Sequence, residues 1–381
     1  DCKDTAVDLD WVWNVVHLTS EDRTRRMDLD ALRRDVEAWF TPAALEEIMG
    51  PPAGHADAVA RSWLAGEGKR WRPFLTACAY RALSEGADGP LPPALRKVAV
   101  AVECFHKASL VHDDIEDADE MRYGEKTLHA EVGVPVALNA GDFLLGEGYR
   151  LLGDLSVDPA VRVDMLRLAA AGHVTLSRGQ GRELLWTRDP SPLSSMDVLE
   201  IFREKTAPAF EVALRLGAFL GGADADTHDV LRKYSECLGI GYQIKDDLED
   251  WSGEGDSRDL EDLRPSLLLA IAHKRAEDGE EKAALDALCR RRARWSEVGP
   301  LVRRVLRERG VLDKADELLE AYKEDAVRSL RFLANATLKG LLRRVVGKIL
   351  GERLIEGYCS EFEARNAAGR APGAQPAAGG R

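Results

Sequence analysis

The chain lacks several features that would place it in common classes of protein. Its six cysteines are scattered, and none belongs to a CxxC pair or to a Cys/His cluster with zinc-ligand spacing. No uncharged apolar run approaches the roughly 20 residues that span a bilayer, and the first residues are acidic where a signal peptide would be basic. These absences argue against a disulfide scaffold, a zinc domain and a membrane bundle. They lead us to expect a reduced, cytoplasmic protein.

The chain also has fewer basic than acidic residues. The chain has 53 Lys and Arg residues against 66 Asp and Glu residues, a formal net charge of −13. Such a charge repels nucleic-acid phosphates, so we expect no nucleic-acid partner. An anionic small molecule can still bind where local basic residues or metal ions reverse the sign of the charge.

Strand-like alternation is hard to find, whereas apolar residues at helical spacing occur along most of the 381 residues. The sequence therefore predicts an all-α fold, with one helical domain over residues 28–358. An acidic extension, residues 1–27, precedes this domain, and residues 359–381 form an Ala-, Gly- and Pro-rich tail that we expect to be disordered. One helix should begin after Pro92 and Pro93 and run into HDDIED. Others are expected at 31–48, 56–65, 74–84, 135–153, 158–186, 194–220, 225–250, 265–276 and 312–354.

One short acidic pattern occurs twice, as DDIED at 113–117 and DDLED at 246–250. On a helix, residues four apart share a face, so Asp113 pairs with Asp117 and Asp246 with Asp250. Two carboxylates about 4 Å apart repel by about 4 kcal/mol at an effective dielectric of 20, which invites a cation. Oxygen ligands without His or Cys favour Mg²⁺. A single motif of this kind is most simply a solvated helix end, but both motifs follow apolar segments that would place them at the mouth of a cavity.

Basic residues that an anionic substrate would need are spread along the chain. Lys69 and Arg72 lie in GKRWRP, which suits a loop entering a helix, and His106 lies two turns before Asp113 on the same helix face. Each could equally be an ordinary surface or structural residue. The remaining candidates are Arg122, Lys126 and Lys205 with its neighbour Thr206.

The chain resembles the trans-isoprenyl diphosphate synthases, also called the polyprenyl synthetase family, over about residues 60–270. The resemblance rests on motifs in a fixed order: GKRWRP, His106, LVHDDIED, Arg122, NAGD at 139–142, GQ at 179–180, Lys205 with Thr206, and GYQIKDDLED. It implies an antiparallel all-α bundle around a deep central cavity, usually as a homodimer. The implied reaction is head-to-tail transfer of a prenyl group from an allylic diphosphate to isopentenyl diphosphate, which gives an all-trans polyprenyl diphosphate.

The resemblance also implies roles for the matching residues. Three Mg²⁺ ions that hold the allylic diphosphate would be bound by Asp113, Asp117 and Asp246, with support from Asp114, Asp247 and Asp250. The same diphosphate would be neutralised by Arg122 and Lys205, and substrate would also contact Gln180. Isopentenyl diphosphate would be bound by Lys69, Arg72 and His106. The developing allylic cation would be faced by Lys205, Thr206 and Gln243.

Two segments depart from the family pattern. The family commonly has RRGxP after the first acidic motif, but here Tyr123 stands in the second Arg position and Lys126 in the Pro position. We hypothesise that Lys126 or the Tyr123 hydroxyl partly replaces the missing arginine as a contact to isopentenyl diphosphate. After the second acidic motif, SGEGDSRDLEDLRPS contains no Lys, and Arg264 stands where a later Lys is common.

Product length should be set on the helix before the first acidic motif. An aromatic residue just before that motif typically stops the chain at fifteen carbons in the family, but here Ala108 and Ser109 are small. Phe105 lies one turn deeper and is the next stop. We therefore expect a product of about twenty carbons or somewhat more.

Two other functions remain open at this point. A terpene cyclase of the same fold would keep the acidic motifs but would not need Lys69, Arg72 and His106. A non-catalytic subunit of a heteromeric synthase would have no reason to keep mutually repelling carboxylates together.

The C-terminal helix has an apolar stripe, Leu338, Leu341, Val345 and Ile349, flanked by basic residues. This stripe could touch a membrane transiently. Alternatively, it packs into the core and leaves a solvated basic face.

Overall fold

The computed structural model describes residues 28–66, 68–84, 89–122, 124–252, 263–277 and 279–351. The expected all-α fold is confirmed over these residues, apart from an antiparallel pair of two-residue strands, β1 (Met121–Arg122) and β2 (Glu125–Lys126). The extension 1–27, the tail 359–381 and Tyr123 lie outside the described residues, as does most of the segment between Trp251 and Arg264.

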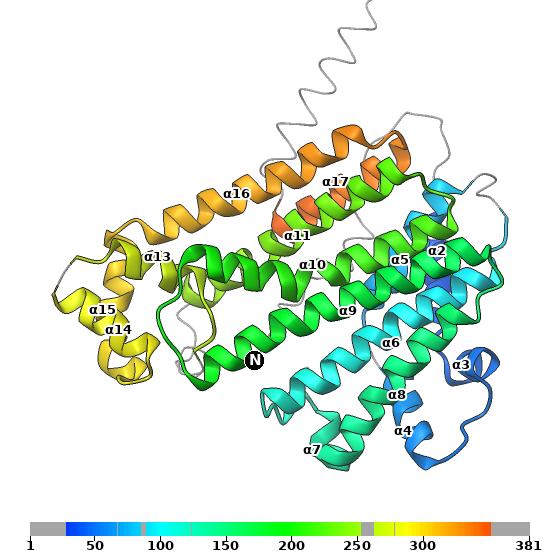
Figure 1. Cartoon of the computed structure of the whole chain (residues 1–381), viewed down its shortest axis with the longest axis horizontal. Coiled ribbons are helices and arrows are strands. Elements are labelled where there is room, and N and C mark those ends of the chain that lie inside the picture. Colours follow the sequence, from blue (N-terminus) through cyan, green and yellow to red (C-terminus); the bar gives the residue numbers. More distant parts are fainter. Residues whose placement is uncertain are drawn as a thin grey trace, which may run out of the picture.

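The helices follow one another in a single bundle (Figure 1). They are α2 (Leu29–Ala38), α3 (Pro42–Met49), α4 (His55–Ala65), α5 (Trp71–Leu83), α6 (Pro93–Glu116), α7 (Leu128–Val132), α8 (Val134–Gly153), α9 (Pro159–Arg188), α10 (Ser195–Leu220), α11 (Ala225–Ser252), α13 (Leu267–Arg275), α14 (Glu280–Cys289), α15 (Trp295–Glu308), α16 (Val311–Ser329) and α17 (Ala336–Leu350).

The long helices pack side by side at the centre of the molecule. Helix α6 packs on α5 and α8, α10 packs against α5, α9 and α11, and α16 covers α11 (Figure 1). On α6 the predicted apolar residues Leu95, Val98 and Val102 are buried, and each contributes about 1.5–3 kcal/mol through that burial. This packing fixes the course of α6, whose last turn carries the first acidic motif.

Two predicted helices are each divided in the structure. The prediction at 31–48 is interrupted where Thr41 accepts a hydrogen bond from the Ala44 N–H and Pro42 begins α3. The prediction at 312–354 is interrupted by a 3₁₀ turn (Leu330–Phe332) and by Asn335, which caps α17 through the Leu338 N–H. In both places the apolar spacing continues, but the helix does not. A capping side chain accepts a hydrogen bond from a backbone N–H at the start of the next helix, and a proline has no N–H to donate to the preceding turn. Helices α14 and α15 were not predicted.

The apolar stripe of α17 faces the core. Leu338, Leu341 and Val345 are buried and Ile349 is half-buried, which fits the alternative that the stripe packs into the core. A transient membrane contact stays a prediction. Within the described ranges, no helix is both long and apolar enough to cross a bilayer.

Candidate active site

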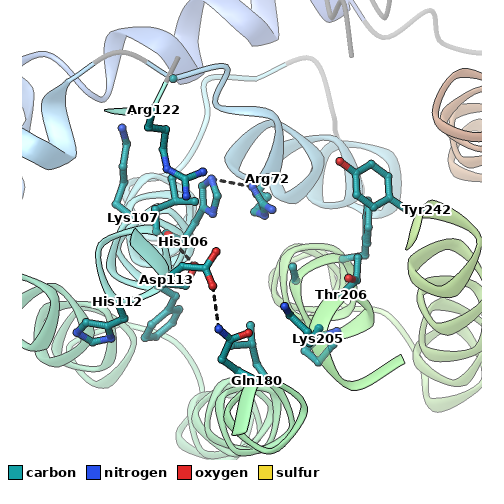
Figure 2. Close-up of a pocket in the computed structure, with 18 of the residues that line it drawn as sticks. Arg72, His106, Lys107, His112, Asp113, Arg122, Gln180, Lys205, Thr206 and Tyr242 are labelled. Carbon is teal, nitrogen blue, oxygen red and sulfur yellow. Dashed lines mark hydrogen bonds between the residues drawn. The ribbon is translucent and has the colours of Figure 1, made fainter. Parts of the chain in front are cut away.

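A cavity of about 1640 Å³ lies between α5, α6, α9, α10 and α11. Most of the predicted site residues line it (Figure 2). They are Lys69, Arg72, Phe105, His106, Ser109, Asp113, Arg122, Lys126, Gln180, Lys205, Thr206, Gln243, Asp246, Asp247 and Asp250. The described residues Ala108, Asp114 and Asp117 are not among the lining residues.

Asp113 is the aspartate of the first acidic motif that lines the cavity. Its carboxylate accepts a hydrogen bond from the Gln180 Nε2 amide at 3.0 Å, and Gln180 also donates to Glu116 at 2.8 Å (Figure 2). Burial raises the pKa of Asp113 to about 6; nearby Lys205 lowers it, and Asp117 raises it. A carboxylate held in this way is stabilised by any cation that arrives beside it.

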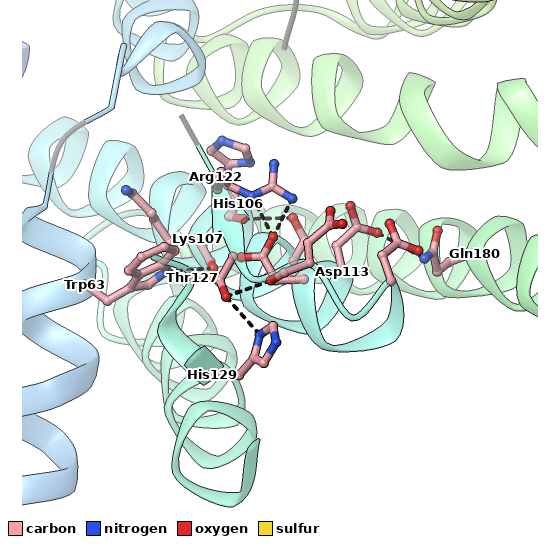
Figure 3. Close-up of polar contacts among 12 residues, drawn as sticks. Trp63, His106, Lys107, Asp113, Arg122, Thr127, His129 and Gln180 are labelled. Carbon is pink, nitrogen blue, oxygen red and sulfur yellow. Dashed lines mark hydrogen bonds and ion pairs between the residues drawn. The ribbon is translucent and has the colours of Figure 1, made fainter. Parts of the chain in front are cut away.

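The other two aspartates of the first motif are bonded to arginines. Asp114 is buried and pairs with Arg122 at 2.6 Å (Figure 3). Asp117 pairs with Arg264 at 2.8 Å. The burial of Asp114 and its arginine partner tie β1 to the end of α6. The role of Asp114 in supporting a metal ion, which the resemblance implies, stays a prediction.

In the second acidic motif, all three aspartates, Asp246, Asp247 and Asp250, line the cavity, and Asp247 also makes contacts within the fold. Asp247 is buried and accepts hydrogen bonds from the N–H groups of Leu267 and Leu268 at 2.7 and 3.1 Å. Burial raises its pKa to about 7, and these hydrogen bonds lower it. Asp247 thus anchors the first turn of α13. That it also supports a metal ion, as the resemblance implies, stays a prediction.

The acidic residues do not make a complete metal site on their own. In the parts of the chain that the structure describes, no three His, Cys, Asp or Glu side chains gather closely enough to hold an ion. Asp113, Asp246 and Asp250 nevertheless line one cavity from two helices. This donor set fits Mg²⁺, which commonly takes one or two protein carboxylates and completes its shell with water and substrate phosphates.

Basic residues gather where the beginning of α5 lies near the second half of α6. The Arg72 guanidinium donates to His106 Nε2 at 2.8 Å (Figure 2). Burial, followed by the charge of Arg72, holds the pKa of His106 well below its usual range. The imidazole is therefore neutral, and since Nε2 accepts, Nδ1 is the atom that can donate to an anion.

Arg70, between Lys69 and Arg72, has a different position. It is buried, pairs with the buried Glu103 at 2.5 Å and donates to the carbonyl oxygens of Leu64 and Gly66. It thus fixes the loop that presents its two neighbours to the cavity. The left-handed backbone of Arg70 (φ 49°) turns the chain into α5 at this point.

Lys205 and Thr206 are held rigidly on α10. The Lys205 ammonium pairs with Glu183 of α9 at 2.8 Å. Two glycines let the neighbouring helices approach the backbone of α10 at this point. A Cβ atom on Gly179 of α9 would lie 2.8 Å from the Lys205 backbone nitrogen, and one on Gly239 of α11 would lie 2.7 Å from the Ala207 Cα. Only residues without a side chain permit this approach of α9 and α11 to α10.

Two of the three residues that we expect to set product length line the cavity. Phe105 and Ser109 line it, whereas Ala108 is fully buried in the packing around α6. The Phe105 ring packs against Tyr149 with centroids 4.9 Å apart, and the Tyr149 hydroxyl lies 3.1 Å from His173 Nδ1. An aromatic and polar layer from α8 and α9 therefore lies behind Phe105.

Several residues of this site were not found from the sequence. Glu183, Tyr149 and His173 had no motif to mark them, because each depends on which helix lies opposite. Lys107 was also missed, although a lysine within the apolar part of a predicted core helix is itself a signal. Lys126 lies exposed in β2 at the cavity, and its suggested alternative, Tyr123, lies outside the described residues.

Known proteins are similar to this chain in sequence and in architecture. The family model described as "Polyprenyl synthetase" matches residues 55–304. A geranylgeranyl pyrophosphate synthase of Geoglobus acetivorans is 32% identical over 285 residues, which cover 74% of this chain and 86% of that protein. Its solved namesake from the same organism has a TM-score of 0.70 at 28% identity, over 84% of this chain and 100% of the other. A polyprenyl synthase from Caulobacter crescentus CB15, complexed with calcium and isoprenyl diphosphate, has a TM-score of 0.66 at 26% identity, over 87% and 100%.

Proposed function

The chain belongs to the polyprenyl synthetase family, and from that premise we propose that it is a metal-dependent prenyltransferase. It would transfer the prenyl group of an allylic diphosphate head to tail onto isopentenyl diphosphate, giving an all-trans polyprenyl diphosphate. The observation that carries this proposal is the shared cavity: Asp113, Asp246 and Asp250 line the same space as Lys69, Arg72 and His106. Two separate groups of anion-binding side chains suit two diphosphate substrates.

The metal in this proposal is Mg²⁺, held by Asp113, Asp246 and Asp250 together with diphosphate oxygens. The Caulobacter relative was crystallised with a divalent ion and isoprenyl diphosphate, which supports the same pairing here. When bound, the metal supplies positive charge that stabilises the departing diphosphate. Asp117 would join these ligands when Arg264 turns from it toward the substrate.

The side chains around α10 would then act on the reacting carbon atoms. The bond from carbon to diphosphate oxygen breaks with its electrons leaving on the diphosphate, whose growing charge Lys205 neutralises. The double bond of isopentenyl diphosphate attacks the allylic carbon, and a proton then leaves the new cation for the departing diphosphate. Thr206 and Gln243 present polar atoms to the cation, while the apolar walls exclude water.

One set of incubations tests this function against a terpene cyclase and a non-catalytic subunit. The purified chain is incubated with Mg²⁺ and C5, C10, C15 or C20 allylic diphosphates, each with and without isopentenyl diphosphate. We expect elongated diphosphates only when both substrates are present. Hydrocarbon or alcohol from the allylic substrate alone would indicate a cyclase, and no product in any tube would indicate a partner-dependent subunit.

We also propose that the product is C20 or somewhat longer, with Phe105 as the stop. Changing Phe105→Ala opens the floor toward Tyr149 and is expected to lengthen the main product by one or more isoprene units, because no bulky side chain then blocks the growing tail. Mass spectrometry of the dephosphorylated products measures this. Phe219→Ala, a half-buried phenylalanine on α10 that does not line the cavity, should leave product length unchanged. Equal product lengths for all three proteins would remove Phe105 from this role.

We further propose that the protein forms a homodimer and lies in the cytoplasm. Exposed apolar side chains occur along α8 and α9, where a second copy could cover them: Val134, Val136, Leu138, Val163, Val174 and Leu185. Sedimentation equilibrium should give twice the chain mass of 41.9 kDa. The free cysteines at 78, 104, 237 and 289 suit a reducing compartment.

A further inference from the structure

Gly148 of α8 lies directly against the ring of Phe105, the residue that we propose as the stop for the growing product. Gly148 is buried and is not among the residues that line the cavity. A Cβ atom on Gly148 would lie 2.5 Å from the Phe105 Cε1, 2.8 Å from its Cζ and 2.9 Å from its Cδ1. These three atoms form one edge of the ring, so the ring occupies the space that a side chain at position 148 would need.

A second ring of α6 meets α8 in the same way. His112 follows Phe105 by seven residues, and Gly141 precedes Gly148 by the same number, about two helical turns. A Cβ atom on Gly141 would overlap the His112 imidazole. The helices lie side by side (Figure 1), and each glycine of α8 receives one ring of α6. The missing side chain at position 148 is therefore part of the fit between these two helices.

The other surroundings of the Phe105 ring decide where it can move. The Tyr149 ring lies against it with centroids 4.9 Å apart. Cys104 and Ala108, which lie beside Phe105 on α6, are fully buried, and a packed interior has little free volume. The cavity of about 1640 Å³, which Phe105 lines, has room for the ring. A ring pushed away from α8 would therefore move into the cavity.

We propose that Gly148 is a positioning residue that sets product length through Phe105, without touching substrate itself. Because position 148 carries no side chain, the Phe105 ring lies back against α8 and leaves more of the cavity open to the growing prenyl tail. This inference rests on the proposed function and on Phe105 as the stop, and it names the residue that fixes where that stop lies.

The proposal gives Gly148 and Phe105 opposite effects on product length. An ordinary contact between a Cβ atom and the ring needs about 3.4 Å, whereas the space at Gly148 allows 2.5 Å. A methyl group at position 148 would move the ring toward the tail, so elongation should end earlier. Removal of the ring at position 105 should instead let elongation continue.

Product analysis of Gly148→Ala tests the proposal. The full chain is incubated with Mg²⁺, isopentenyl diphosphate and a C10 allylic diphosphate, and the dephosphorylated products are measured by mass spectrometry. The ratio of the product one isoprene unit shorter to the main product should rise about 10-fold or more, because even one methyl group of misfit in an apolar pocket discriminates by that factor. The rate of the first addition should stay within about 2-fold, because the change lies away from the acidic motifs.

Gly146→Ala is the matched control. Gly146 lies exposed on the same helix, and a Cβ atom there has nothing within 4 Å. This variant makes the same chemical change two residues earlier and should leave the product ratio as it is in the unaltered chain.

The double variant Phe105→Ala/Gly148→Ala separates an effect through the ring from any other effect. With no ring to displace, the methyl group at position 148 should leave the product lengths of Phe105→Ala unchanged. The melting temperature provides a second measurement: Gly148→Ala should lower it by a few degrees in the presence of Phe105, and should not lower it in the Phe105→Ala background.

The outcomes distinguish this inference from the function on which it rests. If the unaltered chain forms no elongated product, the proposed function fails and this inference fails with it. If the unaltered chain elongates, an unchanged product ratio for Gly148→Ala overturns the role of Gly148 alone, as does a shortening that persists without the Phe105 ring. A Gly148→Ala chain that does not fold would show that the ring has no room to move, and this result would overturn the proposal too.

Discussion

A chain carrying Asp246→Asn is expected to turn over about 10³-fold more slowly than the unaltered protein. The asparagine keeps the shape of the side chain but removes the charge that would hold a metal ion against the leaving diphosphate. The loss should appear in kcat, because the missing stabilisation grows as the carbon–oxygen bond breaks. Initial rates with both diphosphates across a range of Mg²⁺ concentrations measure it, and higher Mg²⁺ should restore part of the rate.

Asp226→Asn is the matched control for this substitution. Asp226 lies exposed in the first turn of the same helix, α11, far along it from the acidic motif. Its replacement makes the same chemical change and should leave kcat and the Mg²⁺ dependence as they were. Asp246→Asn and Asp226→Asn with the same kcat would contradict a metal-binding role for the second motif.

Changing Glu103→Gln should lower the free energy of unfolding by about 3 kcal/mol. Glu103 is 2% exposed and is the charged partner of the buried Arg70, so its replacement leaves the guanidinium uncompensated beside Lys107. Urea denaturation followed by circular dichroism measures the loss, with the slope of the transition checked for each protein.

An exposed ion pair provides the comparison for that stability change. Glu37 pairs with Arg33 four residues earlier on α2, and these side chains are 47% and 36% exposed, far more than those of Glu103 and Arg70. Glu37→Gln should change the free energy of unfolding by no more than about 0.5 kcal/mol. If the two glutamate substitutions cost the same, the Arg70–Glu103 pair does not stabilise the loop that carries Lys69.

The all-α fold and the course of α6 could be predicted from the sequence because both follow from local pattern. The apolar spacing of Leu95, Val98 and Val102 sets the buried face of the helix, and Pro92 sets its start. The places where other helices end were harder to predict. Thr41 and Asn335 cap helices inside patterns that look continuous, and a cap depends on backbone geometry that apolar periodicity does not report.

In the candidate site, too, the sequence predicted the motifs but not the contacts of each side chain. Spacing correctly grouped the aspartates into two motifs, but it could not tell which carboxylate faces the cavity and which is used in the fold. Asp247 bonds to α13 and Asp114 to Arg122 because of what lies across from them. The partners themselves, such as Glu183 for Lys205, come from a different helix and carry no signal in the local sequence.

The close contacts at Gly179 and Gly239 have a consequence for how the proposed enzyme could change its product. At these two points no side chain larger than hydrogen fits, so the spacing of α9 and α11 from α10 is fixed by the glycines. Phe105 lines the cavity elsewhere, on α6, with its ring against Tyr149. If Phe105 is the stop that we propose, replacing this one aromatic ring would change product length without altering the helix contacts beside Lys205 and Thr206.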